Sequence, residues 1–480
     1  MFAKIQRIHF VGIGGIGMSG IAEVLLNLGY RISGSDLRNS AVTQRLAALG
    51  ASIVEGHAAA NIVAADVVVT SSAISVDNPE VAEARRLHVP VIQRAEMLAE
   101  LMRLKYGIAI AGMHGKTTTT SMVAAVLAAG GLDPTVVVGG RVDAMGSNAR
   151  LGKSHYLVAE ADESDRSFLK LSPILSVVTN IDREHMDCYR DMRDVRRTFL
   201  EFMERVPFYG MVVGCNDDLV LRRLLPRVHR RVTTYGTSRG SDFLISMRAP
   251  LGTSSQDAEK HSPLIRFHVT YKEKDLGEFT LRVPGAHNVL NATAAIAVGT
   301  ALDIPAEQIR SGLNGFRGVD RRFQLKGKAA GVSVIDDYGH HPTEIRATLA
   351  AARQCGFRRV HVIFQPHRFT RTRDLMDEFA TAFAEADTLC LLDIYPASEK
   401  PIEGITAEAL VDRIAGAGNR SVTYASSFSD AVASVAALAE PGDMVLTLGA
   451  GSVSQLGAML LEKMESANQL GTVSIRENQL

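Results

Sequence analysis

The amino-acid sequence predicts an α/β protein of three domains, each built on a mainly parallel sheet. Three observations lead to this fold class. The chain has 480 residues, and at about 150 residues per domain this length suggests three domains. Short apolar runs alternate with stretches of helical periodicity, which is typical of buried parallel strands joined by helices. Two glycine-rich loops each follow an apolar run, which indicates two α/β domains of the nucleotide-binding type in one chain.

The glycine loops and the apolar runs divide the chain into three blocks. The first block covers residues 1–106, the second 107–318 and the third 319–480. The main expected strands lie at 7–11, 67–70, 108–111, 176–180, 359–364 and 444–448.

Three other segments have a distinct character. The charged stretch 94–105 is expected to be a helix that closes the first block. The polar, turn-rich segment 250–274 is expected to be a surface loop. The tail 465–480 has little apolar periodicity and is expected to be loosely held.

The composition excludes several classes of protein. Lys and Arg total 52 and Asp and Glu total 52, so the formal net charge is zero and no nucleic-acid partner is expected. No apolar stretch approaches the ~18 residues of a membrane span, and the first residues lack a signal-peptide pattern. We therefore expect no membrane insertion and a cytoplasmic protein. The 4 cysteines form no CxxC pair and are expected to be reduced.

The first glycine loop has the pattern G-x-G-x-x-G. Gly12, Gly14 and Gly17 follow a strand and precede a helix, and Asp36 comes after the next strand. Such glycines let the backbone approach a pyrophosphate, whose charge is stabilised by the free N–H groups at the start of the helix. The motif alone leaves three interpretations open: NAD, a nucleotide-sugar or a plain tight turn.

The second glycine loop, residues 111–118, is a modified phosphate-binding loop. It departs from the Walker pattern because Ile110 precedes it and the nearest upstream glycine is Gly112. Its functional end is kept. Lys116 can reach the β- and γ-phosphates, and Thr117 can place its hydroxyl on Mg²⁺. The strand-to-helix context favours phosphate binding over a structural turn.

Polar side chains follow the next two expected strands. The acidic segment 160–165 ends one of them, and Asn180 and His185 follow the other. Carboxyl ends of neighbouring parallel strands meet where ligands bind, so this cluster could hold a hard cation. The alternative is a solvated acidic loop.

The last two motifs lie in residues 284–292 and in the third block. Asn288 could cap a helix or read an adenine edge, and taken singly the cap is favoured. In the third block, residues 336–342 and 365–373 each follow a strand and are rich in histidine and arginine. Arginines recognise carboxylates and phosphates in two-point contacts, and histidine or tyrosine can orient an amine or take its proton.

Together these segments resemble the Mur ligases of peptidoglycan synthesis, from about residue 9 to residue 452. The motifs that carry the resemblance are GIGGIGMSG at 12–20, GSD at 34–36, TSSAI at 70–74, GMHGKTTTT at 112–120, AEADESD at 159–165, TNI at 179–181 with HMD at 185–187, PGAHNVLNATAA at 284–295, RRF at 321–323, DDYGHHPTE at 336–344 and QPHRFTRTRDL at 365–375.

The resemblance implies an N-terminal Rossmann-like domain for a UDP-sugar, a central P-loop ATPase-type α/β domain, and a C-terminal Rossmann-like α/β domain that closes over an amino acid. It implies an ATP- and Mg²⁺-dependent ligase that works through an acyl phosphate. The likeness is strongest to the branch whose substrates are UDP-N-acetylmuramate, L-alanine and ATP. A monomer or homodimer is expected.

The resemblance also assigns roles to residues. The UDP-sugar set is Gly12, Gly14, Gly15, Gly17, Met18, Ser35, Asp36, Ser71, Ser72 and Ala73. The ATP set is Gly112, His114, Gly115, Lys116, Thr117, Thr118, His287, Asn288, Asn291, Arg322 and Asp336. The metal set is Thr117, Glu160 and His185, and the amino-acid set is Tyr338, His340, His367, Arg368 and Arg371. The catalytic set is Lys116, Glu160, His185, His340, Arg368 and Arg371.

Some positions depart from the family pattern. They are Met113 for Thr, Arg166 for a small residue, Phe369 for Tyr, and the triplet 182–184. Sister ligases carry a carbamylated lysine near the second metal, but 190–197 contains no lysine, so this modification is not expected. The rival functions are an NAD-dependent oxidoreductase, a non-catalytic nucleotide-binding scaffold, and a recycling ligase that attaches a tripeptide to the same UDP-sugar.

Overall fold

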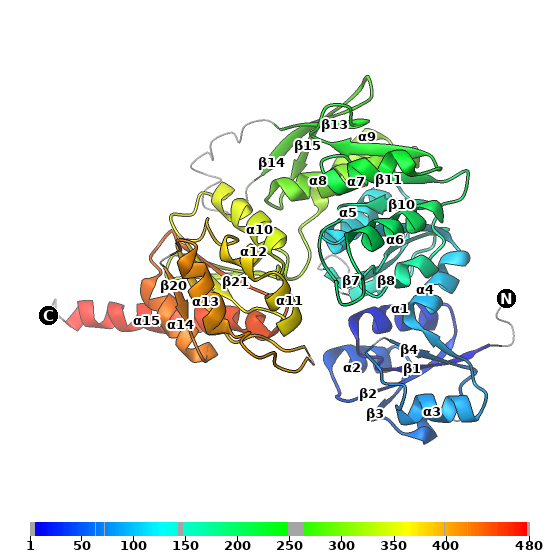
Figure 1. Cartoon of the computed structure of the whole chain (residues 1–480), viewed down its shortest axis with the longest axis horizontal. Helices are drawn as coiled ribbons and strands as arrows, with labels where there is room; N and C mark the ends of the chain where they lie inside the picture. The colour runs from blue at the N-terminus through cyan, green and yellow to red at the C-terminus, as the bar shows by residue number, and fades with distance from the viewer. Residues whose placement is uncertain are drawn as a thin grey trace. The chain divides into compact units, whose positions relative to one another are not determined.

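A computed structural model describes residues 5–62, 64–71, 73–142, 147–247, 264–397, 399–419 and 421–477. The chain forms two compact units. Unit 1 consists of Met1–Ala249, Arg266–Leu281 and Val289–Val319, and unit 2 of Pro250–Ile265, Arg282–Asn288 and Asp320–Leu480. Figure 1 shows the order of the helices and strands along the chain.

The N-terminal sheet of unit 1 has five parallel strands in the order β3-β2-β1-β4-β5. Its strands are β1 (Arg7–Val11), β2 (Arg31–Asp36), β3 (Ser52–Glu55), β4 (Val67–Thr70) and β5 (Val91–Gln93), and its helices are α1 (Ile16–Asn27), α2 (Ala41–Ala48), η1 (Ala59–Ile62), α3 (Pro79–Arg86) and α4 (Arg94–Arg103). Strand order reverses between β1 and β4. Ligands bind at such switch points, outside the carboxyl ends of the strands.

The second sheet of unit 1 has ten strands in the order β15-β14-β13-β12-β11-β10-β6-β9-β7-β8. The strands are β6 (Tyr106–Ala111), β7 (Thr135–Val142), β8 (Ser147–Arg150), β9 (Tyr156–Glu160), β10 (Leu175–Val178), β11 (Met211–Cys215), β12 (Val232–Gly236), β13 (Phe243–Met247), β14 (Ile265–Tyr271) and β15 (Lys274–Leu281). The helices are α5 (Lys116–Ala129), η2 (Ser167–Lys170), α6 (Met192–Glu204), α7 (Leu219–Leu224), η3 (Leu225–Arg227), α8 (Ala286–Ala301) and α9 (Ala306–Gly315). The first turn of α8 belongs to unit 2.

Strand β6 lies between β9 and β10 and pairs with both in parallel. Its residues 107–111 are all buried, as a strand with helices on both faces requires. The second glycine loop leaves the carboxyl end of this strand, so its phosphate-binding backbone is attached to the best-buried part of the sheet.

The third sheet, in unit 2, has the order β16-β17-β21-β18-β19-β20, and only the edge strand β16 is antiparallel. The strands are β16 (Gln324–Ala329), β17 (Val332–Asp337), β18 (Val360–Phe364), β19 (Thr388–Leu391), β20 (Val422–Tyr424) and β21 (Met444–Leu448). The helices are α10 (Pro342–Gln354), α11 (Phe369–Asp374), α12 (Met376–Ala380), α13 (Ala407–Gly416), α14 (Phe428–Leu438), η5 (Ser452–Gln455) and α15 (Leu456–Glu477).

Alternate residues of the central strands of this sheet fill two separate cores. Val362 and Phe364 of β18 join one core with residues of α10, α12 and α13. Ile363 joins the other core with residues of α14 and α15. Helices therefore cover both faces, as a doubly wound parallel sheet requires.

These sheets confirm the three-domain α/β fold class, and strands occur at or within one or two residues of every predicted strand range. The boundaries at 106 and 318 stay predictions. The helix predicted at 94–105 is α4. All 4 cysteines are free, as expected. Among the described residues, no helix combines the length and the apolarity that crossing a membrane requires.

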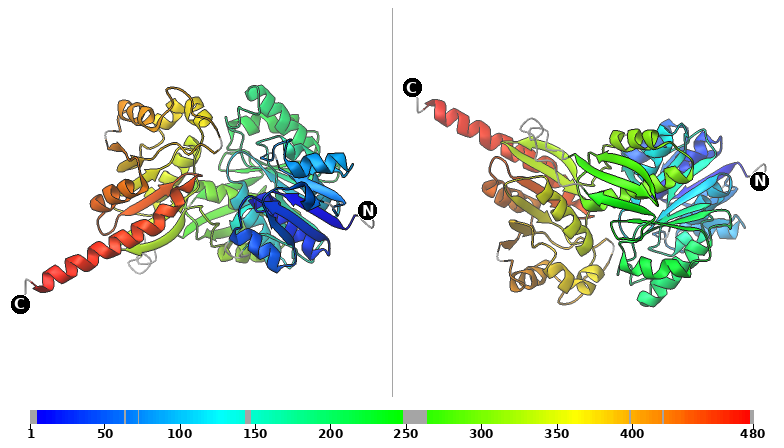
Figure 2. Two further views of the ribbon diagram at one scale, coloured as in Figure 1. Left: turned by 90° about the horizontal axis from the view of Figure 1, so that it is seen from below. Right: turned by 90° about the horizontal axis from the view of Figure 1, so that it is seen from above.

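One expectation about an irregular segment was wrong. The loop predicted over 250–274 overlaps β14, because 265–271 contain alternating buried positions with β-branched and aromatic side chains; residues 250–263 lie outside the described part of the chain. The tail after residue 465 continues α15 to Glu477, and whether it is loosely held stays a prediction. Figure 2 shows α15 as one continuous helix. Its Leu, Met, Glu and Ala residues favour this conformation.

A buried charge cluster stabilises unit 2. Asp443 is fully buried and accepts hydrogen bonds from Nε and Nη2 of Arg358 at 2.9 and 3.1 Å. His361 Nε2 lies 3.1 Å from the same carboxylate, and the N–H group of Glu440 donates to it at 2.9 Å. Burial raises the pKa of Asp443, but the hydrogen bonds from Arg358, Glu440 and His361 lower it to about 2. The Asp443 carboxylate is therefore ionised, and both of its oxygens accept hydrogen bonds.

We expect Asp443→Asn to destabilise unit 2 by about 2 kcal/mol at pH 7, because each pKa unit corresponds to about 1.4 kcal/mol. The pKa in the folded state lies below the usual 3.8. The contribution is thus complete above about pH 4 and is lost as pH falls toward 2. Calorimetric unfolding at pH 7 and pH 3 measures it. Asp377→Asn, which removes an exposed ion pair with Arg413, is the control and should change stability by less than about 0.5 kcal/mol. An equal effect of both variants would contradict the prediction.

Candidate active site

The first glycine loop leaves β1 at its carboxyl end and is tied to the end of β2. Gly12 has a φ of +76°, which glycine adopts without steric cost. The N–H groups of Gly12 and Ile13 donate to the carbonyl oxygen of Ser35 at 2.8 and 3.0 Å. The N–H group of Gly14 donates to Oδ2 of Asp36 at 2.8 Å. The predicted glycine motif and the predicted acidic residue are therefore in direct contact, and Asp36 closes the loop.

The start of α1 supplies the anion-binding groups of this loop. Gly15 is the N-cap residue of α1, and Gly17 lies in its first turn. The first N–H groups of a helix have no partner within the helix and favour an anion. Met18 is only 2% exposed, so its side chain packs in the core while its backbone belongs to this turn.

The turn after β4 lies against the same loop. Ser71 accepts, through its carbonyl, the N–H of Ile74 at 3.1 Å. A Cβ on Gly12 would lie 3.2 Å from Cδ1 of Ile74, so this turn packs on the loop and places Ser71 and Ala73 beside it. The predicted Ser72 lies outside the described residues.

A buried carboxylate that the sequence analysis missed supports the end of β2. Glu80 is fully buried. It accepts hydrogen bonds from Oγ of Ser35 at 2.6 Å and from Nδ2 of Asn61 at 2.6 Å, and Nδ1 of His57 lies 3.1 Å away. Burial raises the pKa of Glu80, but hydrogen bonds from His9, Ser35 and Asn61 lower it to about 2. The ionised carboxylate thus fixes Ser35, whose carbonyl holds the glycine loop.

The second glycine loop is closely packed at two glycines. Gly112 has a φ of +128°, and a Cβ there would lie 2.1 Å from Oγ1 of Thr179. Gly115 has a φ of +82°, and a Cβ there would lie 2.8 Å from Oδ1 of Asn291. Both positions therefore need glycine for conformation and for space. Asn291, predicted to bind ATP, is placed directly against the loop.

Lys116 begins α5 and turns its side chain back over the loop. Its Nζ donates to the carbonyl oxygens of Gly112 and Met113 at 2.7 and 3.2 Å and to Oε1 of Glu163 at 2.7 Å. Burial lowers the pKa of Lys116, but the charge of Glu163 and the hydrogen bond to it raise it. The ammonium group is therefore charged and lies where the loop would hold a phosphate. Thr117 and Thr118 follow it in the first turn of α5.

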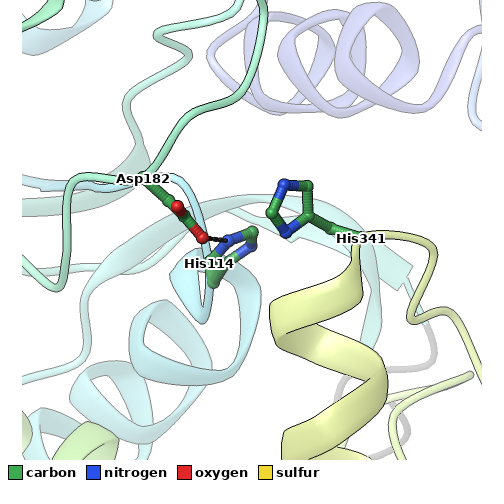
Figure 3. Close-up of side chains that lie close together, drawn as sticks. All are labelled: His114, Asp182 and His341. Carbon is green, nitrogen blue, oxygen red and sulfur yellow. Dashed lines mark hydrogen bonds and ion pairs between the residues drawn. The ribbon is translucent and has the colours of Figure 1, made fainter. Parts of the chain in front are cut away.

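The end of β10 fixes the conformation of the loop at His114. Oδ1 of Asn180 accepts the N–H of His114 at 2.8 Å, and Nδ2 of Asn180 donates to the carbonyl of His114 at 2.9 Å. Nε2 of the His114 ring lies 3.0 Å from Oδ2 of Asp182, the contact that Figure 3 shows as a dashed line. His341, also drawn in Figure 3, belongs to unit 2, where it is the N-cap residue of α10.

Glu163 is one of two acidic residues that the structure places beside the predicted ligand His185; the other is Glu184, whose Oε1 lies 4.0 Å from Nε2 of His185. Oε1 of Glu163 lies 3.6 Å from Nε2 of His185 and contacts Lys116. Its Oε2 is buried and has no hydrogen-bond partner among the described residues. Burial raises the pKa of Glu163 to about 7. A buried carboxylate oxygen without a partner, next to an imidazole, fits a hard cation.

The predicted ligand Glu160 is the last residue of β9 and is only half-buried. Its metal-binding role stays a prediction. Sequence reasoning pointed to the acidic segment 160–165 but could not tell which carboxylate turns toward His185, because a turn separates Glu160 from Glu163. The strained backbone of His185, with a φ of +57°, is typical of residues held in place at a functional site.

The family departure at Arg166 has a structural explanation. Arg166 forms an ion pair with the buried Asp194 and donates to the carbonyl of Cys188 at 2.9 Å. Its guanidinium lies 4.7 Å from the ring centre of Tyr189. The hydroxyl of Tyr189 donates to the carbonyl of Glu163 at 2.6 Å. Arg166 therefore holds in place the segment around Glu163 and His185, the residues that could bind a metal ion.

The predicted adenine-side residues His287 and Asn288 lie in unit 2, at the start of α8. The helix begins at Ala286, so Asn288 is inside the first turn and the expected capping position was wrong. Nδ2 of Asn288 instead donates to the carbonyl of Pro284 at 2.6 Å. Burial, with a further effect of Arg322, lowers the pKa of His287 to about 4, so this imidazole is neutral at pH 7.

Unit 2 brings the predicted amino-acid residues together at the carboxyl ends of β17 and β18. The rings of His340 and His367 are 5.8 Å apart, and Tyr338 meets His340 edge-on at 5.3 Å. Arg371 Nη1 lies 3.1 Å from Nδ1 of His367. Burial, together with His340 and Arg371, lowers the pKa of His367 to about 3. His367 is thus neutral, and its Nδ1 accepts from Arg371.

Tyr395, which the sequence analysis missed, completes this cluster. Its ring stacks on His367 at 5.5 Å with an angle of 10° between the planes. Its carbonyl accepts the N–H of Arg368 at 2.8 Å. Arg368 precedes α11, which begins at Phe369, and has a φ of +73°. No sequence motif marks Tyr395, since it comes from a separate loop.

The predicted residues Arg322 and Asp336 lie near this cluster. Asp336 is fully buried, pairs with Nε of Arg321 at 3.1 Å and accepts from Oγ1 of Thr447 at 2.7 Å. The guanidinium groups of Arg321 and Arg322 lie 5.0 and 5.1 Å from the ring centre of Tyr338. Asp336 thus holds Arg321 directly. Its proposed contact with the nucleotide stays a prediction.

Together, these features define a class of protein. Two glycine-rich loops at the carboxyl ends of parallel strands, one with a charged lysine and a partly unsatisfied carboxylate, are typical of an enzyme that handles two phosphorylated substrates. Family comparison agrees: the models described as Mur ligase family, catalytic domain; Mur ligase middle domain; and Mur ligase, glutamate ligase domain match residues 7–106, 110–299 and 321–451. The chain belongs to the Mur ligase family.

Individual relatives are similar along almost the whole chain. The UDP-N-acetylmuramate–L-alanine ligase of Koribacter versatilis is 72% identical over 472 residues, which cover 97% of this chain and 99% of the relative. The crystal structure of UDP-N-acetylmuramate-alanine ligase from Thermotoga maritima matches with a TM-score of 0.79 at 29% identity, covering 96% of this chain and 99% of that one. A murein peptide ligase of Psychrobacter arcticus shares the fold, with a TM-score of 0.68 at 24% identity over 96% of this chain and 99% of its own.

We expect Glu163→Gln to weaken the binding of a divalent cation in the presence of ATP by 10-fold or more, because it removes a buried anionic oxygen while keeping the size of the side chain. Mn²⁺ titration followed by electron paramagnetic resonance measures this affinity. Glu160→Gln is the matched comparison from the same segment. A loss of Mn²⁺ affinity in Glu160→Gln alone would contradict the assignment of Glu163 and support the sequence-based one.

Proposed function

We propose that this chain is an ATP-dependent ligase that joins L-alanine to the lactyl carboxylate of UDP-N-acetylmuramate, giving ADP and phosphate in peptidoglycan precursor synthesis. The observation that carries the proposal is the arrangement of Lys116, Glu163 and His185 in the segments that follow β6, β9 and β10. Lys116 supplies a fixed positive charge, and Glu163 supplies a carboxylate for a metal ion, where the terminal phosphate of a triphosphate would lie. The identity of 72% to a relative with this name supports the choice of substrates.

The proposed reaction has two steps. An oxygen of the lactyl carboxylate attacks the γ-phosphorus, the bond to the β–γ bridging oxygen breaks, and ADP leaves. The acyl phosphate then reacts with the neutral amine of L-alanine: the new C–N bond forms, the amine loses its proton, and inorganic phosphate leaves. Activation is needed because a free carboxylate offers only a poor leaving group.

Lys116 would stabilise the first step electrostatically. Its ammonium group is buried, charged and held by two loop carbonyls and Glu163. Such a group needs no reorganisation when charge develops on the phosphoryl oxygens, which is how preorganised donors lower a barrier. Magnesium would be held by Thr117 and His185 with Glu163 or the predicted Glu160, and when bound would neutralise phosphate charge.

The cluster of unit 2 would bind the amino acid. Arg371 and Arg368 offer guanidinium groups for the carboxylate of L-alanine. His367 is neutral and already accepts from Arg371, so it would orient that guanidinium and leave the amine to His340 and Tyr338. The stacked pair of His367 and Tyr395 forms an aromatic wall, which suits a small side chain.

The rival functions explain less of the structure. An NAD-dependent oxidoreductase would use the loop at Gly12 but has no role for Lys116 and Glu163, and a scaffold has no need of an unsatisfied buried carboxylate. The identity of 72% to a relative named as an L-alanine ligase favours L-alanine over the tripeptide of a recycling ligase. We further propose a cytoplasmic enzyme that is a monomer or homodimer.

The direct test of the proposed function is an isotope experiment. With ¹⁸O in the lactyl carboxylate, we expect one labelled oxygen to pass into inorganic phosphate in each turnover, because the acyl phosphate collapses with that oxygen on phosphorus. Mass spectrometry of the phosphate measures it, with L-alanine and the tripeptide supplied in separate reactions. Unlabelled phosphate would refute acyl-phosphate chemistry, and turnover with the tripeptide alone would assign the recycling function.

We expect Lys116→Ala to reduce ADP formation by at least 1,000-fold, since it removes the fixed cation of the phosphate loop. Binding of UDP-N-acetylmuramate, measured by calorimetry, should change less than twofold because that ligand uses the loop at Gly12. Lys153→Ala, at an exposed position of the same domain, is the control and should keep full activity. Loss of UDP-sugar binding in Lys116→Ala would mean that the two loops are wrongly assigned.

A further inference from the structure

Arg94, the first residue of α4, lies directly against the glycine loop of the N-terminal sheet. A Cβ on Gly17 would lie 2.3 Å from Nη1 of Arg94 and 3.1 Å from its Cδ. The space that a side chain at position 17 would need is therefore filled by this guanidinium. Gly17 lies in the first turn of α1, where the free N–H groups favour an anion.

The other amino group of Arg94 reaches the central domain within unit 1. Nη2 donates to Oδ2 of Asp162 at 2.7 Å, across 68 positions of the sequence. Oδ1 of Asp162 accepts from the N–H and the hydroxyl of Ser164 at 3.1 and 2.6 Å. Glu163, between these two residues, is the partner of Lys116. One guanidinium thus spans the first turn of α1 and the acidic segment of the phosphate site.

A second contact ties the same ends of the two elements together. Nζ of Lys170, in η2, donates to Oε1 of Gln93 and to Oε1 of Glu96, both at 2.9 Å. The start of α4 is therefore held to the acidic segment and the helix after it at two points. The contacts of Lys170 oppose a rotation of α4 as a whole. A movement of the Arg94 side chain would therefore act on Asp162 through the hydrogen bond between them.

We propose that Arg94 is a positioning residue that couples the two nucleotide sites. This inference rests on the proposed function. The diphosphate of UDP-N-acetylmuramate, bound at the loop of Gly12, would engage Nη1 while Nη2 keeps Asp162, because a guanidinium has five donors in a rigid fork. Fixing Arg94 in this way fixes Asp162 and hence Glu163, so that UDP-sugar binding prepares the site for the triphosphate.

The size of this effect depends on the diphosphate and not on the ion pair alone. The side chains of Arg94 and Asp162 are 29% and 37% exposed, and a pair of this kind contributes little by itself. A phosphate adds a charge-assisted hydrogen bond to the same guanidinium. Coupling between two sites commonly changes affinity by about 5- to 150-fold and is reciprocal, and we expect about 10-fold here.

The experiment measures the affinity for the non-hydrolysable analogue adenylyl imidodiphosphate by calorimetry, with and without saturating UDP-N-acetylmuramate and without L-alanine. In the wild-type protein the UDP-sugar should strengthen analogue binding about 10-fold, and the analogue should strengthen UDP-sugar binding by the same factor. In Arg94→Ala and in Asp162→Asn this factor should fall below 2. Arg103→Ala, which removes an exposed ion pair with Glu100 on the same helix, should keep the wild-type factor.

The variants separate coupling from simple binding. Asp162→Asn should lose the coupling while its affinity for the UDP-sugar alone stays within twofold, because Nη1 of Arg94 remains in place. If Arg94→Ala weakens UDP-sugar binding but keeps the coupling factor, Arg94 only binds phosphate and the inference is overturned. Arg94→Lys, which keeps the charge but not the fork, should retain less than half of the wild-type factor and covers a failure of Arg94→Ala to fold.

Different results would overturn this inference alone and the proposed function as a whole. A wild-type protein that binds both ligands and turns over L-alanine, but shows no coupling, overturns the role of Arg94 alone. A wild-type protein that does not bind UDP-N-acetylmuramate overturns the proposed function and this inference together.

Discussion

The interaction on which the phosphate site depends is the buried ion pair of Lys116 and Glu163. A buried ammonium group is costly unless it is paired and hydrogen-bonded, and Lys116 meets this need with one carboxylate and two loop carbonyls. The same loop contains Gly112 and Gly115, both with positive φ, where an added Cβ would clash with Thr179 and Asn291. Backbone conformation and space therefore require glycine at these two positions of the loop that carries the ion pair.

The residues around the ion pair are also fixed by buried polar contacts. Glu163 can be buried beside Lys116 because Tyr189 binds its carbonyl and Arg166 holds the neighbouring segment through Asp194. In the N-terminal sheet, the buried Glu80 holds Ser35 and thereby the other glycine loop. In both domains a glycine-rich loop is held by a buried acidic side chain, Glu80 through Ser35 in the first and Glu163 through Lys116 in the second. The buried acidic side chains thus fix loops whose glycines would otherwise leave the backbone free to adopt many conformations.

The fold and the loops could be predicted from the sequence because their signals are local. The apolar run 7–11 is β1, and the glycine patterns mark strand-to-helix turns whatever the rest of the chain does. What the sequence could not predict depends on contacts between distant residues. Arg94 meets Asp162 across 68 positions, and Tyr395 reaches His367 from another loop. The approach of Glu163 to His185 depends on the direction of one turn, which periodicity does not encode.

Backbone strain in each of the two units explains why the strained residues need so many partners. His185, Arg166, Arg321 and Arg368 all have positive φ values, between 57° and 73°, and each such non-glycine residue costs about 1–3 kcal/mol. These conformations persist only where other contacts over-determine them. Arg321 is held by Asp336, Arg368 by the carbonyl of Tyr395, and Arg166 by Asp194 and Cys188. Buried residues such as Asp336 and Asp194 thus act indirectly: their ion pairs with Arg321 and Arg166 offset the cost of the strained backbone.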